Sequence, residues 1–331
     1  MLASSLEGEH TCHSDSEPAS GIKVNMPQQK ALSATASKRR AYWIDEIVKI
    51  SGHFGQDSSR AEAELKSEIK RDGSPALLDH LHLCGAIPEN YGHDSSEEKL
   101  YSKYTDALLS AALNHIGLTA IVLTERADAA DVEAVGKNYS LVGDAKVFRL
   151  SRTAKNQKDF KIEAMHGWKR GKPHALVVCP IYQLPTRTSQ IYQQAITRNV
   201  CIFSYAHLAV LIRIADELGK DRAESLLLSV LRCNEELNPS KDSVSYWSRL
   251  NQTMLRYHNK VRDLWAIEKL ATIESIAAAK QEALTFLARE REGIMRMTRE
   301  EAIGFLIAGR NIGGKTRVIK SVGDNGILSI S

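Results

Sequence analysis

One short region of this 331-residue chain constrains its fold and chemistry more than any other. Two apolar segments, residues 130–135 and 141–146, lie close together in the sequence, and each carries an acidic side chain. Side chains two positions apart on a strand point to the same face, so Asp144 and Lys146 are expected to project together, with Ala145 turned inward. If Asp131 arrives from the neighbouring strand, two carboxylates meet. Such a pair binds a hard divalent cation through oxygen.

An acid followed, after a short gap, by Asp144-Ala145-Lys146 is the pattern of the PD-(D/E)xK nucleases. Ala130 stands where the full motif has a proline, which is not a ligand. The spacing is weakly specific by itself, because Asp-x-Lys occurs by chance in most chains of this length. A solvated ion pair at the edge of a strand is therefore an alternative interpretation of these three residues.

The residues that follow are more specific. Residues 148–161 read Phe-Arg-Leu-Ser-Arg-Thr-Ala-Lys-Asn-Gln-Lys-Asp-Phe-Lys. Together with residues 141–146, this run closely resembles the HindIII family of type II restriction endonucleases. Residues 96–103, 189–191, 203–204, 207–209 and 298–303 are similar to the family as well. The resemblance spans residues 75–310 and is densest over 95–210, whereas the first 40 residues have no recognised counterpart.

The resemblance implies a fold, an activity and a set of roles. The fold class is α/β (α+β): a restriction-endonuclease-like core with a mixed central sheet flanked by helices, followed by a largely helical C-terminal region. The implied activity is Mg²⁺-dependent cleavage of both strands of palindromic DNA at AAGCTT, after the first A, giving 5′-phosphate and 3′-hydroxyl ends. Asp131, Asp144 and the Ala145 carbonyl would hold one or two Mg²⁺ ions, and Lys146 would orient or deprotonate the attacking water. A homodimer and a cognate DNA methyltransferase are the implied partners.

Two other functions remain compatible with the residues. A repair or junction-resolving nuclease of the same core would keep Asp131, Asp144 and Lys146 but lack sequence specificity. A non-catalytic DNA-binding protein would carry a degenerate site, although all three core residues are present here.

Composition is that of an ordinary globular protein, with 43% hydrophobic and 25% charged residues. The formal net charge of +4 permits nucleic-acid binding without requiring it. No stretch approaches the roughly 20 apolar residues of a membrane span, and the N-terminus lacks the apolar core of a secretory signal. The five scattered cysteines suit reduced thiols in a cytosol. We therefore expect a cytoplasmic protein with no membrane partner, and the resemblance implies one of bacterial type.

Three regions are expected along the chain. Residues 1–40 are polar and aperiodic, which predicts a disordered or loosely attached extension. Its charged run, residues 38–40, either contacts DNA or forms a solvated face. Residues 41–220 are expected to form the nuclease core with its N-terminal helices. Residues 221–331 are predicted to be largely helical, with either one long helix or two stacked helices over 243–292. We expect this region to support a dimer and flank the DNA; the alternative is that it only packs against the core.

Glu98 has two interpretations. Ser95 and Glu98 have the spacing of a capping box at the start of a helix. Alternatively, Glu98 is a third carboxylate near the metal, because helices that precede the first strand of this nuclease core often supply one. We treat it as a weak candidate site residue.

Strands are expected at 119–124, 131–136, 140–148, 174–180 and 200–203, the first three as a meander and the last two in parallel. After the strand expected at 140–148, a basic residue recurs at every third position: Arg149, Arg152, Lys155, Lys158 and Lys161. That spacing predicts one basic side of a helix or of its entry loop, facing DNA phosphates. Asn156 and Gln157 are side chains of the type that reads adenine, although a helix cap and a solvent-facing residue would explain them equally well.

Overall fold

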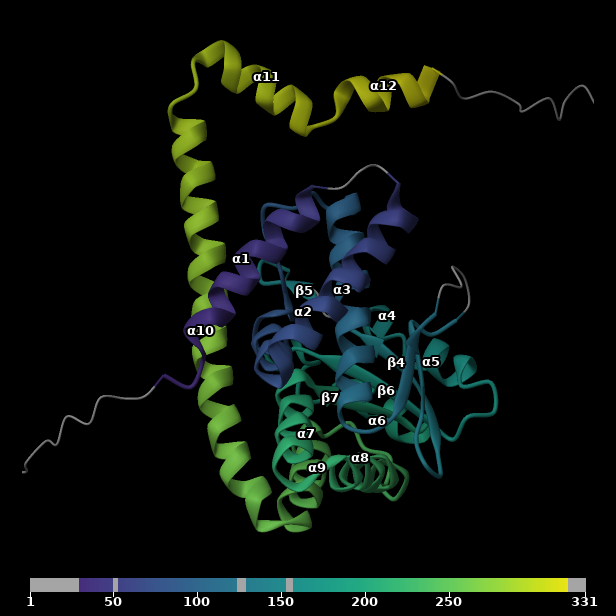
Figure 1. The fold of residues 1–331 in the computed structure, drawn as a ribbon. Coiled ribbons are helices and arrows are strands. Elements are labelled where there is room, and N and C mark those ends of the chain that lie inside the picture. The colour runs from purple at the N-terminus through teal and green to yellow at the C-terminus, as the bar shows by residue number, and fades with distance from the viewer. Residues whose placement is uncertain (1–29, 50–52, 124–128, 153–156, 321–331) are drawn as a thin grey trace, which may run out of the picture. The chain divides into compact units, whose positions relative to one another are not determined.

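A computed structural model describes residues 30–49, 53–123, 129–152 and 157–320 of the chain. At its centre is a five-stranded sheet in the order β2-β3-β4-β6-β7 (Figure 1). The strands are β2 (Thr119–Val122), β3 (Val132–Val135), β4 (Ser140–Ala145), β6 (His174–Cys179) and β7 (Val200–Ser204). The predicted α/β class with a mixed central sheet is confirmed.

Strand direction changes in the middle of this sheet. Strands β2, β3 and β4 form the expected antiparallel meander, and β6 and β7 then run parallel to β4. Every residue of β6 and β7 is buried, as is usual for parallel strands that are covered on both faces. The predicted strand over 140–148 is split in two: β4 ends at Ala145, and β5 (Phe148–Arg149) pairs with the short strand β1 (Ala86–Ile87) instead.

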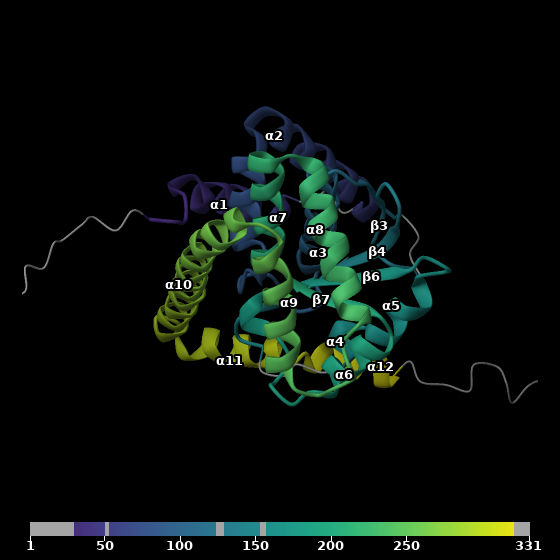
Figure 2. The same cartoon turned by 90° about the horizontal axis from the view of Figure 1, so that it is seen from below.

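Helices cover both faces of the sheet (Figure 2). Helix α3 (Ser96–His115) packs on β2, β3 and β4, and it contacts α7 (Tyr205–Leu218) on the same side. The short helices α4 (Gln157–Phe160), α5 (Ile162–Trp168) and α6 (Gln190–Thr197) pack together, and α5 and α6 contact the sheet. A 3-10 turn, η1 (Ile181–Gln183), follows β6. Gly219, with φ of 90°, ends α7.

The N-terminal helices differ from the sequence prediction in two respects. Helix α1 (Ala34–Val48) begins before residue 40, with the Ser33 hydroxyl accepting a hydrogen bond from the amide of Ala36. The expected extension over 1–40 is therefore wrong for its last residues, while residues 1–29 lie outside the described part of the chain. The sequence pattern also predicts two separate helices, one over 58–71 and one that carries Leu77 to Leu83. These are the two halves of α2 (Phe54–Leu83), which bends where Gly73 adopts φ of 72°.

The arginines of α1 form ion pairs within the protein rather than a solvated face. Arg39 pairs with Asp72 at 2.7 Å, with Asp79 at 3.1 Å and with Glu68. Arg40 is buried, and its guanidinium donates two 2.6 Å bonds to Glu282, which lies 242 residues later in the chain. Two residues of the basic run at 38–40, Arg39 and Arg40, thus join distant parts of the sequence.

The C-terminal region is helical, as predicted. It comprises α8 (Lys220–Glu235), α9 (Ser243–Tyr257), α10 (Asn259–Met295), α11 (Arg299–Gly309) and α12 (Ile312–Lys320). Two helices rather than one cover 243–292, because His258 is extended between α9 and α10. The spacing of Thr298 and Glu301 predicts a capping box, and this capping box opens α11. The glycines after Ala308 predict a break in the helical region, but Gly313 and Gly314 lie inside α12. None of the described helices combines the length and apolar character that a membrane span requires.

Candidate active site

The end of β4 carries the two residues of the Asp-x-Lys pattern. Asp144 is 1% exposed and Lys146 is 9% exposed, and the Lys146 ammonium donates a hydrogen bond to an Asp144 carboxylate oxygen. The Lys146 backbone is fixed on two sides, since its amide donates to the Val178 carbonyl at 2.7 Å and its carbonyl accepts from the Tyr205 hydroxyl at 3.0 Å. The expectation that these two side chains share a face is confirmed.

Asp131 lies immediately before β3, in the position expected of it. The last paired residues of β3 and β4 at this end are Val132 and Gly143, so one step further along the ladder Asp131 comes opposite Asp144. Its side chain is 26% exposed, and its carboxylate accepts a 2.7 Å hydrogen bond from Lys103 of α3. The antiparallel pairing of two strand ends thus places one partly exposed and one buried carboxylate together.

A third carboxylate, that of Asp106 on α3, completes the cluster. Ligand oxygens of Asp106, Asp131 and Asp144 all lie within 4.8 Å of one another. Asp106 was not among the candidates taken from the sequence. The sequence offered one indication, because Asp106 stands inside an otherwise apolar stretch of a helix. In the structure it is 3% exposed, and buried acids are rare unless they are paired.

Burial and neighbouring charges perturb this cluster. Burial raises the pKa of Asp106 well above its usual range. The negative charge of Asp131 raises this pKa further, as does that of Asp144, whereas Lys103 opposes the rise. Burial tends to lower the pKa of Lys103, but the carboxylates of Asp106 and Asp131 outweigh it and the pKa is raised. The site therefore attracts positive charge strongly.

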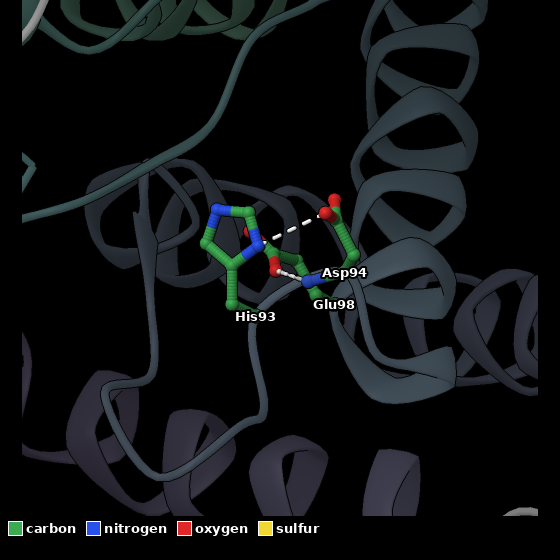
Figure 3. Close-up of side chains that lie close together, drawn as sticks. All are labelled: His93, Asp94 and Glu98. Atoms are coloured by element: carbon green, nitrogen blue, oxygen red, sulfur yellow. Dashed lines mark hydrogen bonds and ion pairs between the residues drawn. The ribbon is translucent and has the colours of Figure 1, made fainter. Parts of the chain in front are cut away.

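Glu98 occupies a different place from the one that its catalytic interpretation requires. It lies at the start of α3, where one carboxylate oxygen accepts from the Asp94 amide at 2.8 Å and from Arg149 at 3.2 Å. Its own amide donates to the Ser95 hydroxyl, so the capping interpretation accounts for its surroundings. Figure 3 shows Glu98 beside His93 and Asp94. These three residues form a group separate from that of Asp106, Asp131 and Asp144.

The three aspartates have the chemistry that a hard cation selects. Carboxylate oxygens are the protein ligands preferred by Mg²⁺ and Ca²⁺, and close packing of three of them creates a concentration of negative charge that a divalent ion relieves. Two ammonium groups, those of Lys103 and Lys146, already bond to these carboxylates in the structure. The residues present therefore fit a divalent cation.

The basic residues after the site do not form one continuous helical face. Helices α4 and α5 are separated at Lys161, which has φ of 48° and places its ammonium 5.5 Å from the centre of the Trp168 ring. Arg149 is turned inward, with its side chain 14% exposed and bonded to Glu98 and to the Gly92 carbonyl. Arg152 is 43% exposed and pairs with Asp159. The prediction of a single basic face is wrong for Arg149 in particular.

The remaining candidates for DNA contact are placed only in part. Lys155 and Asn156 lie outside the described residues, and Gln157 and Lys158 form the first turn of α4. These four residues thus belong to the segment between β5 and α5, close in sequence to the metal-site strand.

The fold and the site together define a class of protein. A mixed sheet whose central strand ends in Asp-x-Lys, with a further aspartate from the adjacent strand, is the restriction-endonuclease-like architecture of the PD-(D/E)xK nucleases. The family model described as HindIII restriction endonuclease matches residues 40–323 of the chain. The type II restriction enzyme HindIII of Haemophilus influenzae is 33% identical over 279 residues, covering 80% of this chain and 90% of that protein. The chain therefore belongs to the HindIII restriction endonuclease family, whose members are type II site-specific deoxyribonucleases.

Proposed function

We propose that this endonuclease cuts both strands of palindromic DNA in a Mg²⁺-dependent reaction, at AAGCTT, leaving 5′-phosphate ends. The observation that carries the proposal is the gathering of Asp106, Asp131 and Asp144 beside Lys146 in a member of this family. The site AAGCTT and a cut after its first A are what the resemblance to the HindIII family implies, and the 33% identity to HindIII supports applying them to this chain.

Each residue of the cluster has a proposed role. Asp131 and Asp144, with the Ala145 carbonyl and the additional carboxylate of Asp106, would hold one or two Mg²⁺ ions. A divalent cation bound there supplies charge neutralisation at the scissile phosphate and lowers the pKa of a nearby water. Lys146 orients that water and stabilises the negative charge that develops on phosphorus oxygens, because its backbone is fixed by Val178 and Tyr205.

DNA contact is proposed for the segment that follows the site. Arg152, Lys155, Lys158 and Lys161 would face phosphates, and Asn156 and Gln157 would read adenine. Arg149 is proposed as a support for this segment, since it joins β5 to the loop before α3 through Glu98 and Gly92. Glu98 is accordingly proposed as a helix cap rather than as a metal ligand.

A homodimer is proposed because a two-fold enzyme matches a two-fold DNA site. Helix α11 has no buried residue although much of it is apolar, and monomeric proteins seldom expose large apolar patches. We therefore place the dimer contact in the helical region 221–331. The nuclease core is proposed to comprise residues 41–220. A cytoplasmic location and a cognate methyltransferase that protects the host DNA complete the proposal.

The test is cleavage of a long natural DNA by the full chain, with and without Mg²⁺. Discrete fragments that match AAGCTT sites, seen only with Mg²⁺, are expected. A smear would replace this proposal with a nuclease that lacks sequence specificity. Intact DNA at every Mg²⁺ concentration would leave a protein that binds DNA without cutting it.

A further inference from the structure

Lys103 lies between two of the clustered carboxylates. From α3, its ammonium reaches Asp131 at 2.7 Å and Asp106, one helical turn further along, at 3.1 Å. The side chain is 29% exposed, so it is partly accessible to solvent. Unlike Lys146, this lysine belongs to neither the Asp-x-Lys pattern nor the proposed catalytic roles.

The charges of the site explain why an ammonium is bound at this place. Three carboxylates whose oxygens lie within 4.8 Å of one another repel strongly when no cation is present. Lys146 bonds to Asp144, which leaves Asp106 and Asp131 to Lys103. The Lys103 ammonium therefore lies between the carboxylates of Asp106 and Asp131, at the place where a divalent ion would also bind.

We propose that Lys103 is the resident counter-ion of the site: it holds Asp106 and Asp131 together until a divalent cation binds, and then gives up Asp131. The inference rests on the proposed function, because it takes the three aspartates as a cation site. An ammonium and a divalent ion on the same carboxylate repel each other, which favours exchange over coexistence. Lys103 stays close to Asp106 because both residues lie on α3, so it can pair with Asp131 again when the ion leaves.

A plain bracing role gives different expectations. If Lys103 only fastened α3 to the start of β3, its removal would loosen the cluster and weaken cation binding. If Lys103 occupies the place of the cation, its removal strengthens cation binding, because no partner has to be displaced. The direction of the change in affinity separates the two.

The first experiment measures Ca²⁺ binding by calorimetry in the absence of DNA, at one mildly alkaline pH. Lys103→Met is expected to bind Ca²⁺ about three- to tenfold more tightly than the unsubstituted protein, since a partly buried pair is worth somewhat more than an exposed one. Lys99→Met is the matched control. Lys99 is exposed and lies one turn earlier on α3, so the control removes the same charge from the same helix. Equal or weaker binding by folded Lys103→Met than by the control would overturn the inference.

The second experiment uses the unsubstituted protein, so it does not depend on the variant folding. An amine-reactive reagent is applied with and without Ca²⁺, and the modification of Lys103 and Lys99 is compared by mass spectrometry. Ca²⁺ is expected to increase the modification rate of Lys103 several-fold and to leave Lys99 unchanged. An unchanged ratio would show that the Lys103 pair persists and would overturn the exchange.

Asp144→Asn separates failure of this inference from failure of the proposed function. If the unsubstituted protein binds no Ca²⁺, or if Asp144→Asn binds it equally well, the aspartates are not a cation site, and both proposals are overturned. If Ca²⁺ binding depends on Asp144 but the Lys103 results match those of Lys99, only the role of Lys103 is overturned.

Discussion

At the scale of single residues, Asp144 offers the most direct test of the cation site. It is 1% exposed, so its carboxylate interacts mainly with the groups packed around it. Asp144→Asn keeps the size of the side chain but removes one negative charge. We expect it to abolish DNA cleavage and to weaken cation retention in calorimetry, while specific DNA binding is largely preserved. Full cleavage by this variant would remove Asp144 from the mechanism.

Lys146 tests the chemical step rather than the cation. Lys146→Ala is expected to lower the cleavage rate by several orders of magnitude, because one stabilising donor is worth about 10²–10³ and a positioned proton-transfer group adds its own factor. Cation binding should be spared, since Lys146 is not a ligand. Single-turnover cleavage rates measure the loss. A decrease smaller than about tenfold would assign Lys146 to a structural ion pair with Asp144.

The sequence predicted much of this cluster, and its limits are physical. Alternation along a strand was sufficient to place Asp144 beside Lys146, and antiparallel pairing of neighbouring strands brought in Asp131. Asp106 was missed because its approach depends on how a helix crosses the sheet, which periodicity does not encode. Glu98 was considered instead, on the same helix α3, since a capping position is visible in sequence whereas a tertiary contact is not.

At the scale of elements, the approach of α3 to β4 determines whether Asp106 reaches the cluster. Gly143 permits that approach: a Cβ added there would lie 3.1 Å from Leu109 Cδ2 of α3 and 3.5 Å from Val132 Cβ. The residue next to Asp144 thus controls how closely the helix carrying Asp106 lies on the strand.

Gly143→Ala should therefore act through the position of α3. The added methyl group overpacks the contact with Leu109, which costs about 1–3 kcal/mol of unfolding free energy, and it weakens Ca²⁺ binding by moving Asp106 outward. Thermal unfolding and calorimetry measure both effects. Gly167→Ala is the control, because a Cβ there meets no atom within 4 Å. Unchanged Ca²⁺ affinity in Gly143→Ala would mean that Asp106 does not contribute to the cation site.

The segment between β5 and α5 carries the proposed reading of bases. Asn156→Ala or Gln157→Ala is expected to cost about 1–3 kcal/mol of discrimination at an adenine position, because each removes a bidentate partner of that base. Lys158→Ala is the control: losing a phosphate contact should weaken binding to all sequences alike and reduce the salt slope. Binding in Ca²⁺ to the cognate site and to its single-base variants measures this. Equal weakening at every site would place the reading residues elsewhere.

The same segment illustrates why an element is harder to predict than a pattern of charges. A recurrence every three residues predicted one basic helical face, but the backbone turns at Lys161 and divides the region into α4 and α5. Arg149, which begins the pattern, belongs to β5 and is bonded to the loop before α3. Charge spacing describes a surface only when the backbone stays regular over the whole run.

At the scale of the whole molecule, the exposed apolar residues of the last helices indicate where a second copy would bind. Among the described residues from α10 onward, thirteen large apolar side chains are at least 44% exposed: Leu270, Ile273, Leu284, Leu287, Ile294, Met295, Ile303, Phe305, Leu306, Ile307, Ile312, Val318 and Ile319. An isolated chain gains nothing from presenting them to water.

Leu306→Asp with Ile307→Asp is expected to convert the protein from a dimer to a monomer, because charged groups cannot be buried unpaired in an apolar interface. Sedimentation equilibrium measures the mass. Ile121→Asp is the control, since Ile121 is 57% exposed but belongs to β2, outside this helical region. A monomeric unsubstituted protein, or a double variant that remains dimeric, would contradict this placement of the interface.

The long-range anchoring of α1 has a consequence for biosynthesis. Arg40 bonds to Glu282, and the amide of Leu32 bonds to Glu274, across 242 residues in each case. During translation at about 5–20 residues per second, the first helix waits some 12–48 s before its partners emerge from the ribosome. A nascent chain that does not yet include residues 274 and 282 therefore lacks the contacts that fasten α1 and the residues just before it.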